Sequence, residues 1–432
     1  MMTTTKTLAI PFNLGRWLTW SLFALLLLLS PLLFESGLGI TVLSQMGIAI
    51  IACLSYNMLL GQGGMLSFGH AVYTGLGSFM AIHALNLASS GGAPIPVSLV
   101  PLVGGFAGMG FAVLLGYVTT RKSGTTFAMI TLGMAELVFA MSLMVPEFFG
   151  GEGGVSGNRV VGQPFLGITF GPAVQVYYLI AIYTFLAVAA MFAFTGTPLG
   201  RMLNAVRDNP ERVEFVGYDT QRVRYYAFII AGFFAGIAGG LGALTFEIVT
   251  AEVVGAARSG AYLLFTFLGG ATFFFGPIIG AVLMVLAFVL LSEITKAWLL
   301  YLGLVFLFMV MYAPGGIASL IMMNLRVALF GKLKQLLGAY FGMGVTLVMA
   351  LFGAASMIEM VYHLQLGATL GSTLVFLGLP LDSRGLGSWL GSALLMFVGL
   401  ALFELVRRRF ALRWNAIQEG IELEMRRREA AQ

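Results

Sequence analysis

The sequence predicts an all-α integral membrane protein with about 10–12 transmembrane helices, from its composition and the spacing of its charges. Of its 432 residues, 59% are hydrophobic and only 9% are charged, whereas an ordinary soluble domain is about a quarter charged. A membrane-spanning helix needs about 20 mostly apolar residues, and the chain has long stretches without Asp, Glu, Lys or Arg. These are 17–34, 36–120, 160–200, 225–246, 259–292, 297–325, 335–358, 360–381 and 385–403. A soluble enzyme and a disordered chain are therefore excluded.

Two further patterns narrow the class. Unbroken apolar runs such as 281–292 differ from the alternating segments of about 10 residues that build a transmembrane barrel. The single cysteine, Cys53, excludes an intramolecular disulfide. The three histidines have no acidic neighbours in the sequence, so we expect neither a metal site nor a cofactor.

The charge-free stretches accommodate twelve crossings, and the basic residues orient them. The crossings are expected near 17–34, 40–60, 64–85, 98–118, 125–145, 174–194, 225–245, 260–275, 277–292, 298–313, 338–360 and 388–406. The first is a retained helix, since no cleavage site follows it. With both termini cytoplasmic, all but four of the 23 Lys and Arg lie on the cytoplasmic side, as the positive-inside rule requires. Those four are Arg159, Arg258, Lys296 and Arg384.

Two points remain open in this topology. Residues 64–85 and 260–292 could each enter the membrane and return on the same side. The net charge of +5 reflects the cytoplasmic loops, which include Lys6 and Arg16 before the first crossing, and therefore predicts no nucleic-acid partner.

The longest organised cytoplasmic segment is 195–224, where two short helices are expected. Thr197 and Asn209 are each followed by proline, the pattern of a capping residue before the first helical position. Glu211 suits the first turn of the second helix, and Gly217 suits its end. In the first helix, the residues at helical spacing Leu199, Met202, Leu203 and Val206 form one apolar stripe. The segment is either a solvated loop or an element that docks into a partner protein.

Several motifs in this sequence resemble those of a known family, the LivM-type permeases of branched-chain amino acid ABC importers. Residues 207–219, RDNPERVEFVGYD, resemble the family's cytoplasmic coupling loop. The other similar segments follow in the family's order over roughly residues 40–325: GGMLSFGH at 63–70, TLGMAE at 131–136, GGEGG at 150–154, the glycines and proline at 269–280, and PGG at 314–316.

The resemblance implies a transmembrane subunit of an ATP-driven importer in a bacterial inner membrane. Branched-chain amino acids or related small polar solutes would be the substrates. The implied partners are a homologous LivH-type permease, two ATP-binding subunits and a periplasmic substrate-binding protein. The residues themselves agree that the chain is not an ATPase, because it contains no G-x-x-x-x-G-K-[ST] phosphate loop. The alternatives are a self-contained secondary transporter, for which intramembrane charges beyond Glu136 are scarce, and a non-transporting scaffold.

If 195–224 is a docking element, we expect its segment 197–217 to contact an ATPase. We expect apolar side chains to fill a groove there and charged ones to lie at its rim. The residues assigned to coupling are Arg207, Asp208, Glu211, Arg212, Val213, Phe215, Val216 and Gly217.

A substrate path is expected where helices are interrupted, because irregular backbone at membrane depth survives only inside protein or beside a water-filled cavity. Two glycine-interrupted stretches, 61–77 and 269–280, fit this description, although close helix packing explains them equally. His70 either bonds neighbouring backbone or binds substrate. Glu136, in mid-span, should face the helix bundle, either as a structural hydrogen-bonding group or on the path. The candidate path residues are Gly63, Gly64, Ser67, His70, Glu136, Gly269, Gly270 and Thr272.

The chain divides into a permease core, 1–325, and a C-terminal extension, 326–432. The extension adds two apolar segments and a basic amphipathic tail. The apolar stripe of the tail consists of Phe410, Trp414, Ile417, Ile421 and Met425, with arginine clusters at 407–409 and 426–428. We expect this stripe to lie on the anionic lipid of the cytoplasmic leaflet or, as the alternative, to contact a partner.

Overall fold

A computed structural model describes residues 14–92, 95–160, 169–366 and 371–430. The described chain is helical apart from two short antiparallel strand pairs, which confirms the all-α class. It forms two compact units. The first comprises the residues up to Leu286 together with Pro314–Gly316, and the second comprises Ala287–Ala313 and the residues from Ile317 onward. Lys6 lies outside the described residues.

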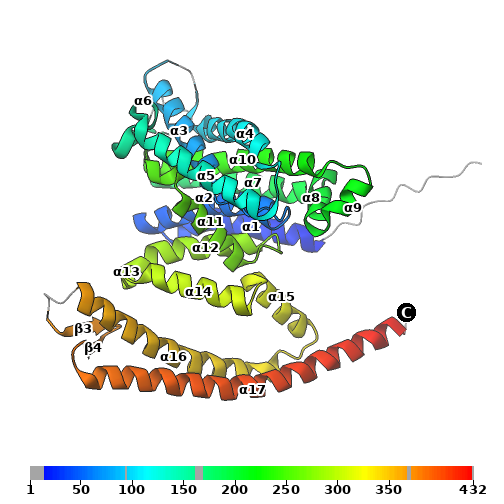
Figure 1. Ribbon diagram of the computed structural model, residues 1–432, viewed down its shortest axis with the longest axis vertical. Helices are drawn as coiled ribbons and strands as arrows, with labels where there is room; N and C mark the ends of the chain where they lie inside the picture. Colours follow the sequence, from blue (N-terminus) through cyan, green and yellow to red (C-terminus); the bar gives the residue numbers. More distant parts are fainter. Residues whose placement is uncertain (1–13, 93–94, 161–168, 367–370, 431–432) are drawn as a thin grey trace, which may run out of the picture. The chain divides into compact units, whose positions relative to one another are not determined.

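The first unit contains seven long helices and several short elements (Figure 1). The long helices are α1 Leu14–Leu33, α2 Gly37–Leu60, α3 His70–Ser89, α4 Val100–Thr119, α5 Gly124–Met144, α7 Ala173–Gly196 and α10 Thr220–Phe246. The shorter helices are α6 Pro146–Phe149, α8 Pro198–Asp208, α9 Pro210–Phe215, α11 Ala256–Gly269 and α12 Gly276–Leu286. The remaining elements are the 3₁₀ turns Val97–Leu99, Gly151–Gly153 and Ala251–Val254 and the strands β1 Val155–Ser156 and β2 Ile248–Val249.

Helix α10 lies at the centre of the first unit and packs against α2, α3 and α4. Small residues allow this contact, since a Cβ added to Gly236 of α10 would lie 2.2 Å from the Gly104 carbonyl oxygen of α4. A Cβ on Gly77 of α3 would lie 2.6 Å from the Gly236 Cα. A Cβ on Gly232 would lie 2.5 Å from the Ala112 Cβ and one on Gly240 would lie 2.8 Å from the Pro101 Cα, so these glycines of α10 also serve close packing with α4.

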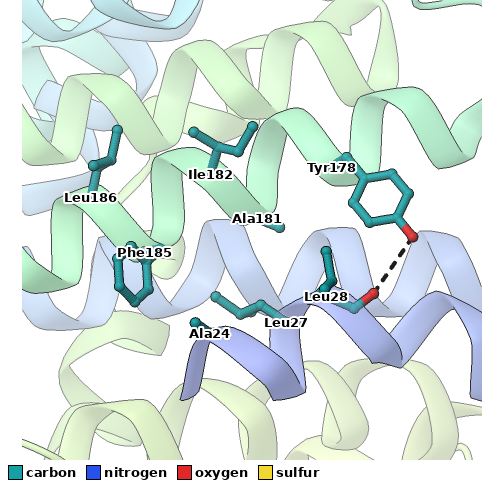
Figure 2. A pocket seen from close by; sticks show the side chains of 8 residues that line it. All are labelled: Ala24, Leu27, Leu28, Tyr178, Ala181, Ile182, Phe185 and Leu186. Atoms are coloured by element: carbon teal, nitrogen blue, oxygen red, sulfur yellow. Dashed lines mark hydrogen bonds between the residues drawn. The ribbon is translucent and has the colours of Figure 1, made fainter. Parts of the chain in front are cut away.

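Helices α1 and α7 enclose an apolar groove of about 270 Å³ (Figure 2). The hydroxyl of Tyr177 donates to the Leu27 carbonyl at 2.7 Å and fastens α7 to α1. Tyr178 reaches the Leu28 carbonyl at 3.5 Å. The groove is lined by Ala24, Leu27, Leu28, Tyr178, Ala181, Ile182, Phe185 and Leu186. These side chains suit hydrocarbon rather than a polar solute.

The second unit is built on a long helical hairpin, α16 Lys334–Leu366 and α17 Leu386–Ala430, whose helices lie side by side (Figure 1). A Cβ on Gly353 would lie 2.5 Å from the Met396 backbone nitrogen, so these two helices are in close contact. The other elements are the π-helical turn Ala287–Leu291, α13 Ser292–Ile294, α14 Trp298–Tyr312, α15 Gly316–Leu329 and the strands β3 Thr373–Phe376 and β4 Leu379–Asp382.

The apolar stripe of the tail is covered by its own chain. Ile417 and Ile421 are buried in one cluster with Val327 and Leu336. Phe410 and Trp414 pack partly buried against the same cluster. The expectation that this stripe lies on lipid is therefore wrong, because residues 327–340 occupy the face that lipid would cover.

Ten helices of the described chain are long and apolar enough to cross a membrane, or up to eleven if the bent pair α14–α15 forms one span. Two of the twelve expected crossings are shorter than a full span. Residues 260–275 fall largely in α11, whose 14 residues rise about 21 Å against a hydrocarbon core of about 30 Å. Residues 298–313 form α14, with 15 residues, which is followed after a 50° bend by α15. The orientation of the termini stays a prediction.

Candidate functional site

The first glycine-interrupted stretch is a buried, non-helical link between α2 and α3. Residues 61–69 leave the helix, and side chains of other helices satisfy their backbone groups. The Thr131 hydroxyl of α5 accepts from the Phe68 amide at 3.1 Å, and the Ser259 hydroxyl of α11 accepts from the Ala71 amide at 2.9 Å. The Tyr56 hydroxyl donates to the Ser67 carbonyl at 2.9 Å. Such partners are what irregular backbone requires at membrane depth.

Ser67 lies inside this link and His70 begins α3 directly after it, both away from any open surface. Both are fully buried. The Nε2 atom of His70 lies 2.8 Å from the Ser55 hydroxyl, and its ring meets Tyr56 edge-on. The sequence predicted that His70 bonds neighbouring backbone or binds substrate. Its hydrogen bond in the structure goes to a side-chain hydroxyl and not to backbone. Neither residue is positioned to touch a solute in this conformation.

The second interrupted stretch, 269–280, contains the turn 270–275 between α11 and α12. Gly270 has φ +113°, a value that favours glycine. A Cβ on Gly269 would lie 2.1 Å from the Gly276 carbonyl oxygen, so this glycine lets the two helices of the hairpin meet. Thr272, in contrast, is exposed. Close packing thus accounts for Gly269 and backbone conformation for Gly270, while Thr272 is exposed to a solute.

The two interrupted stretches meet each other. A Cβ on Gly61 would lie 2.1 Å from the Ala271 carbonyl oxygen. A polar cavity of about 190 Å³ opens at this junction. Its lining residues are Asn57, Gly61, Gln62, Thr195, Asn204, Arg207, Ala271, Thr272 and Phe274. The cavity therefore joins the end of α2, the turn before α12, the end of α7 and α8.

The two helices expected in 195–224 are confirmed with their caps. The Thr197 hydroxyl accepts from the Gly200 amide at 3.1 Å, and Asn209 Oδ1 accepts from the Arg212 amide at 3.1 Å. Gly217 follows with φ +91°. Within α8, Leu203 and Val206 of the apolar stripe are buried. This stripe consequently fastens α8 to its own chain.

Arg207 connects this segment to the first interrupted stretch. Its guanidinium donates to the Gly61 carbonyl oxygen and pairs with Asp208 at 2.9 Å. A Cβ on Gly64, which has φ +63°, would lie 2.9 Å from Arg207 Cγ. A displacement of α8 would therefore act directly on residues 61–64. Gly63 is buried beside them, where a Cβ would lie 2.8 Å from the Leu59 carbonyl oxygen.

The outer surface of α9 differs from that of α8, because it exposes large apolar side chains. Phe215 is 88% exposed and Val216 is 74% exposed. Glu211 and Arg212 are exposed beside them. Val213 is only 5% exposed, so its side chain packs within this chain and does not extend the apolar surface.

Glu136 does not face the bundle, and that expectation is wrong. Helix α5 buries the side that carries Thr131, Ala135 and Val138. Glu136 lies on its exposed side next to Leu137, which is 59% exposed. The side of α5 that carries Ala135 is buried because it packs against α3 and the 3₁₀ turn at 251–254. Glu136 is not among the residues that line the polar cavity.

Three amide side chains that line the cavity were not singled out by the sequence. Asn57, Gln62 and Asn204 line it, and the first two lie in the charge-free stretch 36–120. Amides in so apolar a stretch are a signal that could have identified them. A further buried carboxylate, Glu359, belongs to the second unit and accepts from the hydroxyls of Thr295 and Tyr301.

Comparison with known proteins identifies relatives of this chain. Residues 39–315 match the family described as "Branched-chain amino acid transport system / permease component". The chain is 27% identical over 318 residues to the high-affinity branched-chain amino acid transport system permease protein LivM of Salmonella typhimurium, covering 69% of this chain and 73% of the relative. It is 27% identical over 304 residues to the protein of the same name from Escherichia coli, covering 65% and 70%. No solved structure gives a significant match.

Proposed function

The chain belongs to the family of permease components of branched-chain amino acid transport systems, and from this membership we propose how it works and with which partners. As a member it is a non-catalytic, multi-pass transmembrane subunit of an ABC transport system, a bacterial inner-membrane permease by homology. We propose that it imports branched-chain amino acids or related small polar solutes. It does so with a LivH-type permease, two ATP-binding subunits and a periplasmic substrate-binding protein.

The α8–α9 segment is the proposed docking site for an ATP-binding subunit, and its geometry is the observation that carries the proposal. Phe215 and Val216 form an apolar surface that their own chain leaves uncovered, as expected of an anchor for a partner's groove. Behind this surface, Arg207 binds the Gly61 carbonyl. Movement of a docked ATPase would therefore reach residues 61–64 through the Arg207 side chain.

The exposed side of α5 is proposed to face the translocation path, opposite the second permease. A carboxylate in mid-span is costly in contact with lipid. Glu136 lies 12 residues after the first residue of α5 and 8 before its last. Its carboxylate is therefore far from the water at either end of the helix. A water-filled path between two permeases would provide that water, and the carboxylate would attract the ammonium group of an amino acid.

Reconstitution tests this proposal. The chain alone in liposomes with ATP should not accumulate leucine above empty vesicles. The complete set of subunits, encoded beside this chain or taken from a relative's system, should accumulate it in the presence of ATP. Uptake by the chain alone would contradict the proposal and favour the secondary transporter, for which the exposed Phe215 has no evident purpose.

A further inference from the structure

The polar cavity at the junction of the two interrupted stretches has the properties of a binding site. It is formed by the ends of α2 and α7, the turn at 270–275, and α8. Two of its lining side chains, Asn57 and Gln62, are only 2% and 9% exposed. Within the described chain, Asn57 Oδ1 and Gln62 Oε1 are buried without a hydrogen-bond partner.

Unpartnered buried oxygens of this kind are unusual in a native protein. More than nine in ten buried polar groups are paired, because an unpaired one loses the hydrogen bonds that water would have made. Of the six buried side-chain atoms without a partner in the described chain, these two belong to residues that line the cavity. Both oxygens can accept from a hydrogen-bond donor placed there. The α-ammonium group of an amino acid is such a donor.

The same cavity offers a partner for a carboxylate. Arg207 lines it, and its present acidic partner, Asp208, has a side chain that is 67% exposed. Exposed ion pairs of this type are weak, so a ligand carboxylate can replace Asp208 on the guanidinium. Phe274 and Ala271 supply apolar surface in the same cavity.

We infer that this cavity binds a small zwitterionic amino acid from the cytoplasmic side and that the bound molecule slows the transport cycle. The inference rests on the proposed function for the orientation of the cavity and for the connection of α8 to an ATPase. A ligand that contacts α2, the 270–275 turn and α8 together stabilises the arrangement in which they lie together. Accumulated substrate therefore holds α8 in place and lowers ATP turnover.

The ligand class is tested first on the full chain in lipid nanodiscs, without any ATPase. Labelled leucine should bind and saturate. Neither 4-methylpentanoate, which lacks the ammonium, nor isopentylamine, which lacks the carboxylate, should compete at equal concentration. Competition by either single-charge analogue as strong as by unlabelled leucine would overturn the zwitterion assignment.

The location is tested with variants of two cavity residues. Gln62→Met and Asn204→Leu each keep similar volume and remove an amide. Each should weaken leucine binding roughly threefold to tenfold, the effect of one lost hydrogen bond. The control is Thr184→Val. It removes a fully buried hydroxyl that also has no partner in the described chain, and Thr184 lies outside the cavity. Unchanged binding by both cavity variants would overturn the location.

The regulatory effect is measured on the assembled transporter without its binding protein. ATP turnover should fall as leucine is raised, and Gln62→Met should shift the half-inhibitory concentration upward by the same factor as its binding. Turnover that is independent of leucine in a complex that hydrolyses ATP and transports would overturn the regulatory inference and leave the proposed function standing. Failure of the subunits to assemble would instead contradict the proposed function, while the nanodisc measurement still decides whether the cavity binds leucine.

Discussion

Glu136 shows how much of a single residue's position can be predicted from the sequence. Its position in mid-span is evident from the charge pattern, but α5 is apolar on all sides. A helix of this kind has no polar face that would mark which side is buried. The sequence therefore placed Glu136 on the wrong side of α5. Only the packing of Ala135 and Val138 against neighbouring elements shows which side is buried.

Replacing Glu136 by Gln should reduce amino-acid uptake by the assembled transporter about tenfold or more, because a hydrogen bond to a charged group contributes about 1.5–3 kcal/mol. Uptake is measured in proteoliposomes together with co-purification of the second permease. The control is Glu147→Gln, which alters an exposed carboxylate just after α5. If Glu136→Gln takes up amino acid as fast as the parent, Glu136 does not line the translocation path.

Gly236 allows a second residue-level test, now of stability. Gly236→Ala places a methyl group 2.2 Å from the Gly104 carbonyl oxygen, and overpacking of this kind costs about 1–3 kcal/mol. The melting temperature in detergent should therefore fall. Gly242→Ala in the same helix has no atom within 4 Å of the new methyl and should melt at the parent's temperature or above. Equal melting of the two variants would show that α4 and α10 are not held in this contact.

At the scale of elements, the short capped helices were the most predictable part of the protein. Thr197 with Pro198 and Asn209 with Pro210 determine helix starts through atoms within three residues of each other. The strands β3 and β4 gave no such signal. Their connecting residues, Leu377 and Gly378, have φ of +49° and +83°, and leucine is not a residue that a hairpin turn of this kind normally selects.

The α9 surface supports an element-level prediction. Phe215→Ala should weaken binding of the ATP-binding subunit about thirtyfold, because truncating an anchor commonly costs about 2 kcal/mol. Co-purification and transport should fall together, while membrane insertion is unchanged. Phe34→Ala is the matched control, since Phe34 is also exposed and follows α1 at the opposite predicted side of the membrane. Normal ATPase binding by Phe215→Ala would mean that 195–224 is a solvated loop.

For the whole molecule, the sequence predicted about 10–12 spans, and the described chain has ten candidate spans. The sequence did not predict that α11 and α14 are shorter than a full span. Charge-free length alone cannot show that α11 ends after 14 residues, because its end depends on the contact between Gly269 and Gly276. The polar cavity was likewise hidden, since Asn57, Asn204 and Thr272 are far apart in sequence and meet only through the fold.

The orientation of the molecule yields its own prediction. In a Cys53→Ser background, cysteine replaces one of two exposed acids, Glu152 or Glu211. A membrane-impermeant thiol reagent applied to intact cells should label the first, while the second should react only after permeabilisation. This follows from the positive-inside assignment. The reverse pattern would invert the topology and place α9 outside the cell.

The unbroken length of α17 has a consequence for the electrostatic surroundings of its two arginine clusters. Its 45 residues extend about 68 Å, roughly twice the hydrocarbon thickness. Arg426 lies 17 residues beyond Arg409, or about 26 Å further along a rigid axis. Electrostatic attraction to anionic headgroups decays within about 8 Å at physiological salt. A change in lipid charge would therefore act on the arginines at 407–409, while the distal arginines are left to the ionic surroundings of the aqueous phase.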